Sequence, residues 1–146
     1  MKRRVRVLNG VNLDQLGRRD RVHYGEGSYT DLEFKVGRFA RELDLDVSVE
    51  QTNHEGEFCE WLHEASQTAD GIVLNPGAWT HYSWAIHDAL ELCGLPAVEV
   101  HLSAVEEREE WRRVSVIRDL CIGTVQGEGV DGYRRALELL KEAFAA

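Results

Sequence analysis

The sequence has no apolar run of the roughly 18 residues that a membrane-spanning helix needs, which argues against a membrane partner. Residues 1–4, MKRR, lead directly into a strand pattern, without the apolar core and cleavage site of a signal peptide. Cysteine is scarce: Cys59, Cys93 and Cys121 are odd in number, widely spaced and set among apolar residues, a pattern typical of buried reduced thiols. We therefore expect a cytoplasmic protein.

Basic residues are outnumbered, because 17 Lys and Arg face 26 Asp and Glu, for a formal net charge of −9. Binding along a nucleic-acid backbone requires a basic face, so we expect no nucleic-acid partner. Two short segments depart from this acidic balance, each with three arginines: Arg18, Arg19 and Arg21 in one, Arg108, Arg112 and Arg113 in the other. These segments are two places where a small anion could bind.

Signatures of metals and nucleotides are also missing. His81 and His87 are six residues apart, which does not put both on one helix face, and no cysteine lies near them, so no metal is expected. The turn NGVNLDQLG at 9–17 has neither the dinucleotide glycine pattern nor a P-loop lysine. No strained elbow motif surrounds a serine nucleophile. The sequence therefore predicts no nucleotide cofactor.

The 146 residues, 43% hydrophobic and 29% charged, fit one globular domain spanning 1–146. Strand and helix patterns alternate along the chain, which predicts a three-layer α/β domain with a mostly parallel sheet. The expected strands are 4–8, 46–51, 72–74, 97–103 and 120–125, and the expected helices are 30–43, 58–65, 80–93, 105–113 and 133–144. Thr30 and Glu33 have the spacing of a capping box, and Thr80 or Ser83 could cap the third helix. Residues 14–28 show no period and are either a functional loop or a surface insert.

Polar residues gather at one end of the expected sheet. Asn12 follows the first strand, Asn75 and His81 follow the third, and Ser103 ends the fourth. In open α/β sheets, ligands bind in the crevice beyond the carboxyl ends of the strands. We therefore expect the functional site at this edge.

Glu99 and His101 lie two residues apart on the fourth strand, so both side chains should share one face of the sheet. A carboxylate beside an imidazole fixes the orientation of the ring and favours its protonated form, which suits His101 to protonate a leaving group. A buried pair with a purely structural role is the alternative. The polar neighbours at the same edge favour acid–base chemistry.

Several motifs, in order and at matching separations, resemble those of the type II 3-dehydroquinate dehydratases from about residue 5 to residue 144. They are NGVNL at 9–13, LGRR at 16–19, YG at 24–25, QTNHEG at 51–56, NPG at 75–77, TH at 80–81, EVHLS at 99–103 and REEWR at 108–112. The resemblance implies a flavodoxin-like three-layer sandwich with a five-stranded parallel sheet. It also implies a homododecamer, a tetramer of trimers, that removes water from 3-dehydroquinate to give 3-dehydroshikimate in the shikimate pathway, without a cofactor.

The resemblance further implies a catalytic set. Tyr24 would be the tyrosinate base that removes a proton beside the ketone, with its anion stabilised by Arg19. Asn12 would hold the developing enolate oxygen, directly or through water. His101, oriented by Glu99, would protonate the leaving hydroxyl.

The same resemblance assigns substrate binding to a further set of residues. Segment 17–27 becomes a lid, which explains its lack of periodicity. The expected binding residues are Asn75, His81, Asp88, Leu102, Ser103 and Arg112, of which Asp88 would reach into a neighbouring subunit's site. Trp79, Tyr82 and Trp84 are bulkier than the family pattern and either pack an interface or narrow the site.

Two other functions remain open at this point. One is a catalytically silent anion-binding or assembly module of the same fold, and the other is the same reaction used in quinate catabolism. The presence of Tyr24, Arg19 and His101 together favours an enzyme.

Overall fold

A computed structural model describes all 146 residues, and its centre is a five-stranded sheet in the order β2-β1-β3-β4-β5. Every neighbouring pair of strands is parallel. The strands are β1 (Arg4–Asn9), β2 (Asp46–Gln51), β3 (Gly71–Asn75), β4 (Ala97–His101) and β5 (Gly123–Gln126). This strand order is that of flavodoxin-like domains, so the predicted fold class is confirmed.

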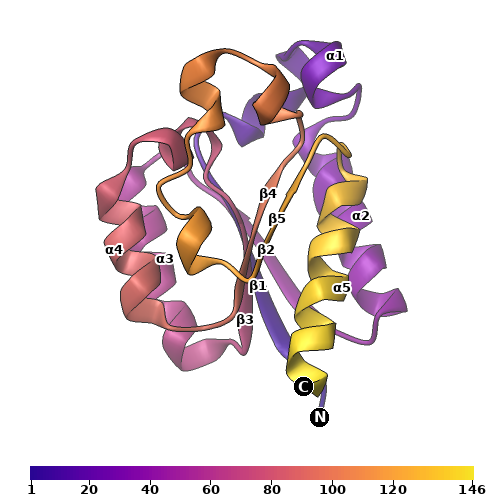
Figure 1. Cartoon of the computed structure of the whole chain (residues 1–146). Helices are drawn as coiled ribbons and strands as arrows, with labels where there is room; N and C mark the ends of the chain where they lie inside the picture. Colours follow the sequence, from indigo (N-terminus) through magenta and orange to yellow (C-terminus); the bar gives the residue numbers. More distant parts are fainter.

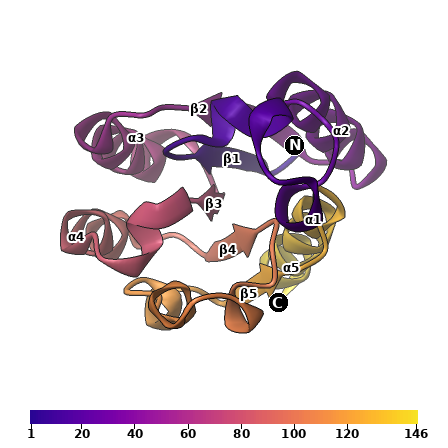
Figure 2. The same ribbon diagram turned by 90° about the horizontal axis from the view of Figure 1, so that it is seen from above.

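Helices cover both faces of the sheet, which gives the three layers. Helices α2 (Tyr29–Glu42) and α5 (Asp131–Ala145) lie on one face, and α3 (Glu55–Thr68) and α4 (Trp84–Cys93) lie on the other (Figure 1). The view from above shows each pair side by side against the sheet (Figure 2). None of the helices combines the length and hydrophobicity that crossing a bilayer requires.

The hydrophobic core has two parts, one on each face of the sheet. Val73 of β3 belongs to the part beneath α2 and α5, whereas Ile72 and Leu74 belong to the part beneath α3 and α4. All five residues of β3 are buried. Burial on both faces explains why the sequence of this strand shows no polar alternation.

The N-terminal cap of α2 differs from the predicted one. Ser28, not Thr30, caps α2: its hydroxyl accepts a hydrogen bond from the Asp31 amide, and the Asp31 carboxylate accepts one from the Ser28 amide. The Thr30–Glu33 capping box was therefore wrong, because Ser28 is the last residue with extended backbone and Thr30 already lies in the helix. Ser83 caps α4, as one of the two expected alternatives.

Several boundaries in the second half of the chain also differ. Strand β4 ends at His101, and β5 starts at Gly123, after a short 3-10 turn, η5 (Arg118–Leu120). The helix expected over 105–113 is two separate 3-10 turns, η3 (Val105–Glu107) and η4 (Glu110–Arg113). Residues 14–28, which show no period in the sequence, nevertheless contain secondary structure: η1 (Leu13–Arg18) and α1 (Arg21–Tyr24) occupy most of the segment.

The loops that follow β1 and β3 pass very close to one another. A Cβ atom on Gly10 would lie 2.4 Å from the Pro76 carbonyl oxygen, and one on Gly77 would lie 2.6 Å from the Val11 carbonyl oxygen. Gly77 also has a φ of +67°, which side chains disfavour. Only glycine at both positions lets these two loops meet at the edge of the sheet.

We expect Gly10→Ala to destabilise the fold by about 1–3 kcal/mol, since backbone atoms must move to admit the methyl group. The free energy of unfolding from denaturant titration measures the effect. Gly56→Ala in α3 is the matched control, because a Cβ there meets nothing within 4 Å. Equal stability of the two variants would contradict the close approach.

Candidate active site

A cavity of about 130 Å³ lies at the carboxyl edge of the sheet. Its wall contains three arginines and two histidines, and it contains no carboxylate. This cationic lining in a chain of net charge −9 favours an anionic ligand. The lining residues are Val11, Asn12, Leu13, Arg19, Tyr24, Asn75, Gly77, Ala78, His81, His101, Leu102, Ser103, Val105, Arg108 and Arg112.

The wall includes every expected site residue except Glu99 and Asp88. Helix α1 and the turns after β4 stand together at this end of the molecule, opposite the chain termini (Figure 1). The cavity therefore lies where loops from distant parts of the sequence meet.

Tyr24, at the end of α1, has its hydroxyl between two guanidinium groups. Arg19 donates to the phenolic oxygen at 2.6 Å and Arg108 donates at 2.7 Å. The Arg19 guanidinium also lies 3.9 Å from the centroid of the tyrosine ring. Both donors are cationic, and hydrogen bonds from cations are stronger than those between neutral groups.

Arg108 was not among the residues predicted for the site, although its arginine-rich segment was noted as an anion-binding place. It is 84 positions from Tyr24 in the sequence, and it also donates to the Ser103 hydroxyl at 3.2 Å. No periodic pattern connects the two residues. Only the folding of both segments over the cavity brings them together.

Glu99 and His101 form a buried pair, with the carboxylate behind the imidazole that lines the cavity. His101 Nε2 lies 2.5 Å from Glu99 Oε2, and the Glu99 side chain is completely buried. Burial alone would raise the pKa of Glu99, but hydrogen bonds from His101, Thr80 and Ser115 outweigh it and hold the pKa below its usual value. Glu99 is therefore an anion at neutral pH.

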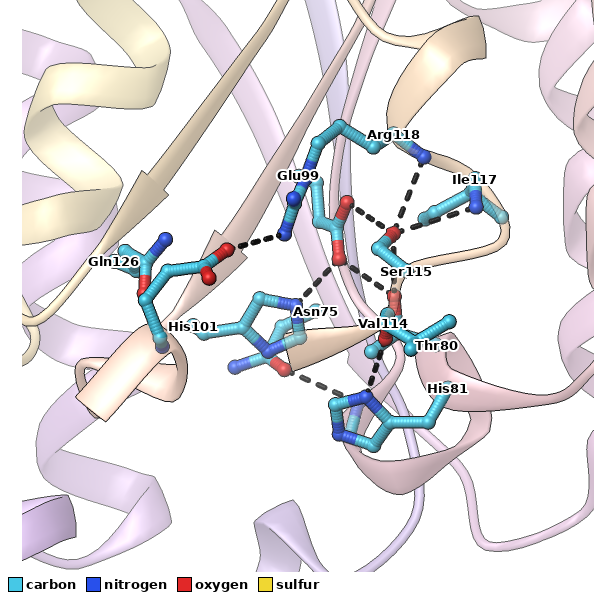
Figure 3. Close-up of polar contacts among 12 residues, drawn as sticks. Asn75, Thr80, His81, Glu99, His101, Val114, Ser115, Ile117, Arg118 and Gln126 are labelled. Carbon is cyan, nitrogen blue, oxygen red and sulfur yellow. Dashed lines mark hydrogen bonds and ion pairs between the residues drawn. The ribbon is translucent and has the colours of Figure 1, made fainter. Parts of the chain in front are cut away.

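His81 is a neutral ring that faces the cavity. Its Nδ1 lies 2.6 Å from the Val114 carbonyl oxygen, so Nδ1 carries the proton and Nε2 is an acceptor (Figure 3). Burial lowers the pKa of His81, and the neighbouring His101 and Arg112 side chains lower it further against the opposing effects of the Val114 carbonyl and the Glu99 carboxylate. The exposed nitrogen can therefore accept a hydrogen bond from a ligand hydroxyl.

Asn75 is held rigidly at the end of β3. Its Oδ1 accepts from the Gly77 amide at 3.1 Å, and its Nδ2 donates to the Tyr133 hydroxyl at 3.1 Å. Tyr133 in turn donates to Asn9 Oδ1 at 2.6 Å. One N–H of the Asn75 amide remains for a ligand.

Asn12 is placed by the QTNHEG segment. It has a left-handed backbone, with φ of +68°, and its amide donates to Asn53 Oδ1 at 2.9 Å. Gln51 bridges the Asn53 side chain and the Gly10 carbonyl. The Asn12 side chain makes no hydrogen bond within the chain and can meet a ligand in the cavity.

Asp88 lies outside the cavity. It is on the exposed side of α4, and its carboxylate is 2.9 Å from Nδ1 of its neighbour His87. One chain therefore does not bring Asp88 to the other site residues.

The comparisons with known proteins agree with each other. A family model described as Dehydroquinase class II matches residues 3–141. The 3-dehydroquinate dehydratase of Thermotoga petrophila is 49% identical over 139 residues, covering 95% of each chain. The 3-dehydroquinate dehydratase 2 of Pseudomonas putida is 46% identical over 149 residues, covering 99% of this chain and 100% of the relative. The crystal structure of type II dehydroquinase from Propionibacterium acnes matches with a TM-score of 0.93 and 42% identity, covering 97% of this chain and 98% of that one.

The fold and the cavity define a flavodoxin-like α/β enzyme. Because the family model covers nearly the whole chain, the protein belongs to the class II dehydroquinase family and is a hydro-lyase. The resemblance drawn from the motifs is thereby confirmed.

Proposed function

We propose that the protein eliminates water from 3-dehydroquinate to give 3-dehydroshikimate, through an enolate intermediate and without a cofactor. The observation that carries the proposal is the pairing, in one cationic cavity, of a phenol oxygen held by two guanidinium groups with an imidazole backed by a buried carboxylate. The first group is suited to be a base and the second an acid. The elimination needs one of each.

The reaction divides into two proton transfers. The Tyr24 phenolate takes a proton from the carbon beside the ketone, and the electron pair of the C–H bond moves to form an enolate, whose oxygen Asn12 stabilises. The enolate then collapses to the carbon–carbon double bond of the enone while the C–O bond breaks, and His101 protonates the departing hydroxyl to release water. Tyr24 ends with a proton and His101 lacks one, so exchange with solvent restores both.

Binding uses the remaining wall. The substrate carboxylate is placed at Ser103 and the neighbouring backbone at Leu102, close to the Arg108 guanidinium. Substrate hydroxyls are assigned to Asn75, to the acceptor nitrogen of His81 and to Arg112. In this scheme segment 17–27, which carries Arg19 and Tyr24, is the lid that completes the site around bound substrate.

The test is to mix the protein with 3-dehydroquinate and follow the absorbance of the enone product. Product formation with turnover supports the proposal, and the absence of product at high enzyme concentration would leave the silent anion-binding module. We place the reaction in the shikimate pathway rather than in quinate catabolism, and the neighbouring genes distinguish the two. The three cysteines are free thiols, which fits the reducing cytoplasm we assign to the protein.

The proposal includes assembly as a homododecamer of four trimers. Tyr82, two residues before α4, is 61% exposed, and Trp84, the first residue of α4, is 63% exposed. With half-exposed Trp111 they leave large apolar side chains in solvent. Exposed aromatic residues of this kind are enriched at protein interfaces. Asp88 lies on the same helix, so docking of another copy here would bring its carboxylate near a second cavity.

We expect sedimentation to give a particle of twelve 16.6 kDa chains. Asp88→Asn is expected to lower turnover by about 10-fold, the effect of one charge-assisted hydrogen bond, although Asp88 lies outside its own cavity. Glu91→Gln, one turn further along α4, is the control and should keep full activity. Monomers with full activity would rule out the assembly.

A further inference from the structure

Two hydroxyl groups behind the proposed site have no part in the reaction scheme above. Thr80, in the 3-10 turn η2 (Gly77–His81), and Ser115, in the loop after η4, both contact the Glu99 carboxylate (Figure 3). Thr80 Oγ1 lies 2.5 Å from Oε2, and Ser115 Oγ lies 2.8 Å from Oε1. Glu99 therefore has hydroxyl partners on both oxygens.

The direction of the Ser115 hydrogen bond follows from its other partners. Its Oγ accepts from the backbone amide of Ile117 at 3.3 Å and from that of Arg118 at 3.1 Å, and an amide N–H can only donate. A hydroxyl has a single hydrogen, and with its lone pairs so engaged Ser115 directs that hydrogen to Glu99.

The distances around Thr80 show that its hydroxyl also donates to Glu99. Its Oγ1 lies 3.3 Å from Ser115 Oγ but 2.5 Å from Glu99 Oε2, so its one hydrogen goes to the shorter contact. Both hydroxyls are donors, and Glu99 is an acceptor on each oxygen. A carboxylic acid with a proton of its own would clash with one of these donors, so the arrangement fits the carboxylate only.

This arrangement decides which nitrogen of His101 can react. Because the carboxylate holds no proton, the hydrogen between Glu99 and His101 belongs to Nε2. The other ring nitrogen, Nδ1, points away from Glu99 on the side of Asn75 (Figure 3). Nδ1 is thus the atom that carries the transferable proton.

The other titratable groups around the pair do not change this assignment. His81 stacks on His101 with ring centroids 6.3 Å apart, and its lowered pKa keeps it neutral. Burial, together with the Glu99 charge, raises the pKa of the Cys121 thiol to about 12, so this thiol adds no second anion. The Arg118 guanidinium pairs with Glu106 at 3.2 Å, and Arg112 pairs with Glu109 at 2.8 Å.

We propose that Ser115, together with Thr80, is a positioning residue for the acid step: the two hydroxyls hold Glu99 as an oriented anion, so that His101 keeps one proton on Nε2 and delivers another from Nδ1. This inference rests on the proposed function for the identity of the step. The tautomer of His101, however, can be measured without any turnover.

The experiment compares variants that remove a hydroxyl with variants that keep it. Ser115→Ala is expected to lower kcat by about 10- to 100-fold, the loss of one hydrogen bond to a charged group, with KM changed by less than about twofold. Ser115→Thr retains the hydroxyl and should recover most of the rate. Thr80→Val and Thr80→Ser form a second pair, which decides the question if Ser115→Ala fails to fold.

Nitrogen NMR of the His101 ring measures its tautomer, which would not change if the two hydroxyls had only a structural role. In the parent protein the neutral ring should be the Nε2–H tautomer, and in Ser115→Ala and Thr80→Val it should become a mixture of both tautomers. An unchanged tautomer with an unchanged kcat would overturn the positioning role, as would an equal loss in Ser115→Thr. A parent protein that shows the Nε2–H tautomer but no dehydration would instead overturn the proposed function and leave the hydroxyl assignment standing.

Discussion

Tyr24→Phe is expected to remove nearly all turnover while substrate binding changes little. The substitution deletes one oxygen and almost no shape, but that oxygen is the proposed base and accepts both guanidinium hydrogen bonds. General bases contribute about 100- to 10,000-fold to rate, so kcat should fall by an amount in that range. Steady-state kinetics with 3-dehydroquinate, and ligand titration of the variant, measure the two effects separately.

Tyr82→Phe is the matched control for this substitution. It removes the same phenolic oxygen from an exposed tyrosine that does not line the cavity and makes no side-chain hydrogen bond in the chain. It also keeps the aromatic ring that the proposed interface would use, so it should retain full kcat. If Tyr24→Phe kept more than about a tenth of the parent rate, Tyr24 would not be the base, because even a weak general base contributes more than that.

His101→Ala is expected to block departure of water while leaving the first proton transfer intact. Deleting the imidazole removes the proposed acid and leaves Glu99 buried without its histidine partner. Arg19 and Arg108, however, both contact Tyr24 without involving His101. Dehydration should slow by about 100- to 10,000-fold. Exchange of the substrate proton beside the ketone with deuterated solvent, followed by mass spectrometry, should continue.

The distinction between the two variants tests the order of steps. His63→Ala, which removes an exposed imidazole from α3, is the control and should dehydrate at the parent rate. Loss of both dehydration and exchange in His101→Ala would mean that His101 also acts in proton removal. Loss of exchange in Tyr24→Phe together with its survival in His101→Ala is the pattern that the proposed mechanism requires.

The features that the sequence predicted well depend on neighbours along the chain. Apolar runs such as Ile72–Leu74 predicted the central strand, and helical spacing of apolar residues predicted α5, because burial of one face imposes a period on the sequence. The shared carboxyl edge of parallel strands then placed Asn12, Asn75 and His81 at one cavity. Tyr24 was identified by family resemblance alone, since nothing in the spacing of its segment marks it.

Local errors arose where two short signals competed. Both Ser28–Asp31 and Thr30–Glu33 fit a capping box, and the backbone selects the former only because the helix begins at Tyr29. The segment between β4 and β5 is rich in charged residues and was expected to be helical, yet it forms separate turns. Arg108, which lies between two of them, donates to the distant Tyr24, a contact that the local pattern does not indicate.

The order of apolar and polar residues by itself determined the layers of this protein, the parallel sheet and the edge at which its reactive groups collect. Only the tertiary structure decided that Arg108 joins Arg19 on the Tyr24 oxygen and that Thr80 and Ser115 both donate to Glu99. The physical reason is that burial leaves a periodic trace in the sequence, whereas a hydrogen bond between two loops depends on where several unrelated turns place single atoms. Hydrogen bonds between loops therefore produce no periodic pattern in the sequence from which they could be predicted.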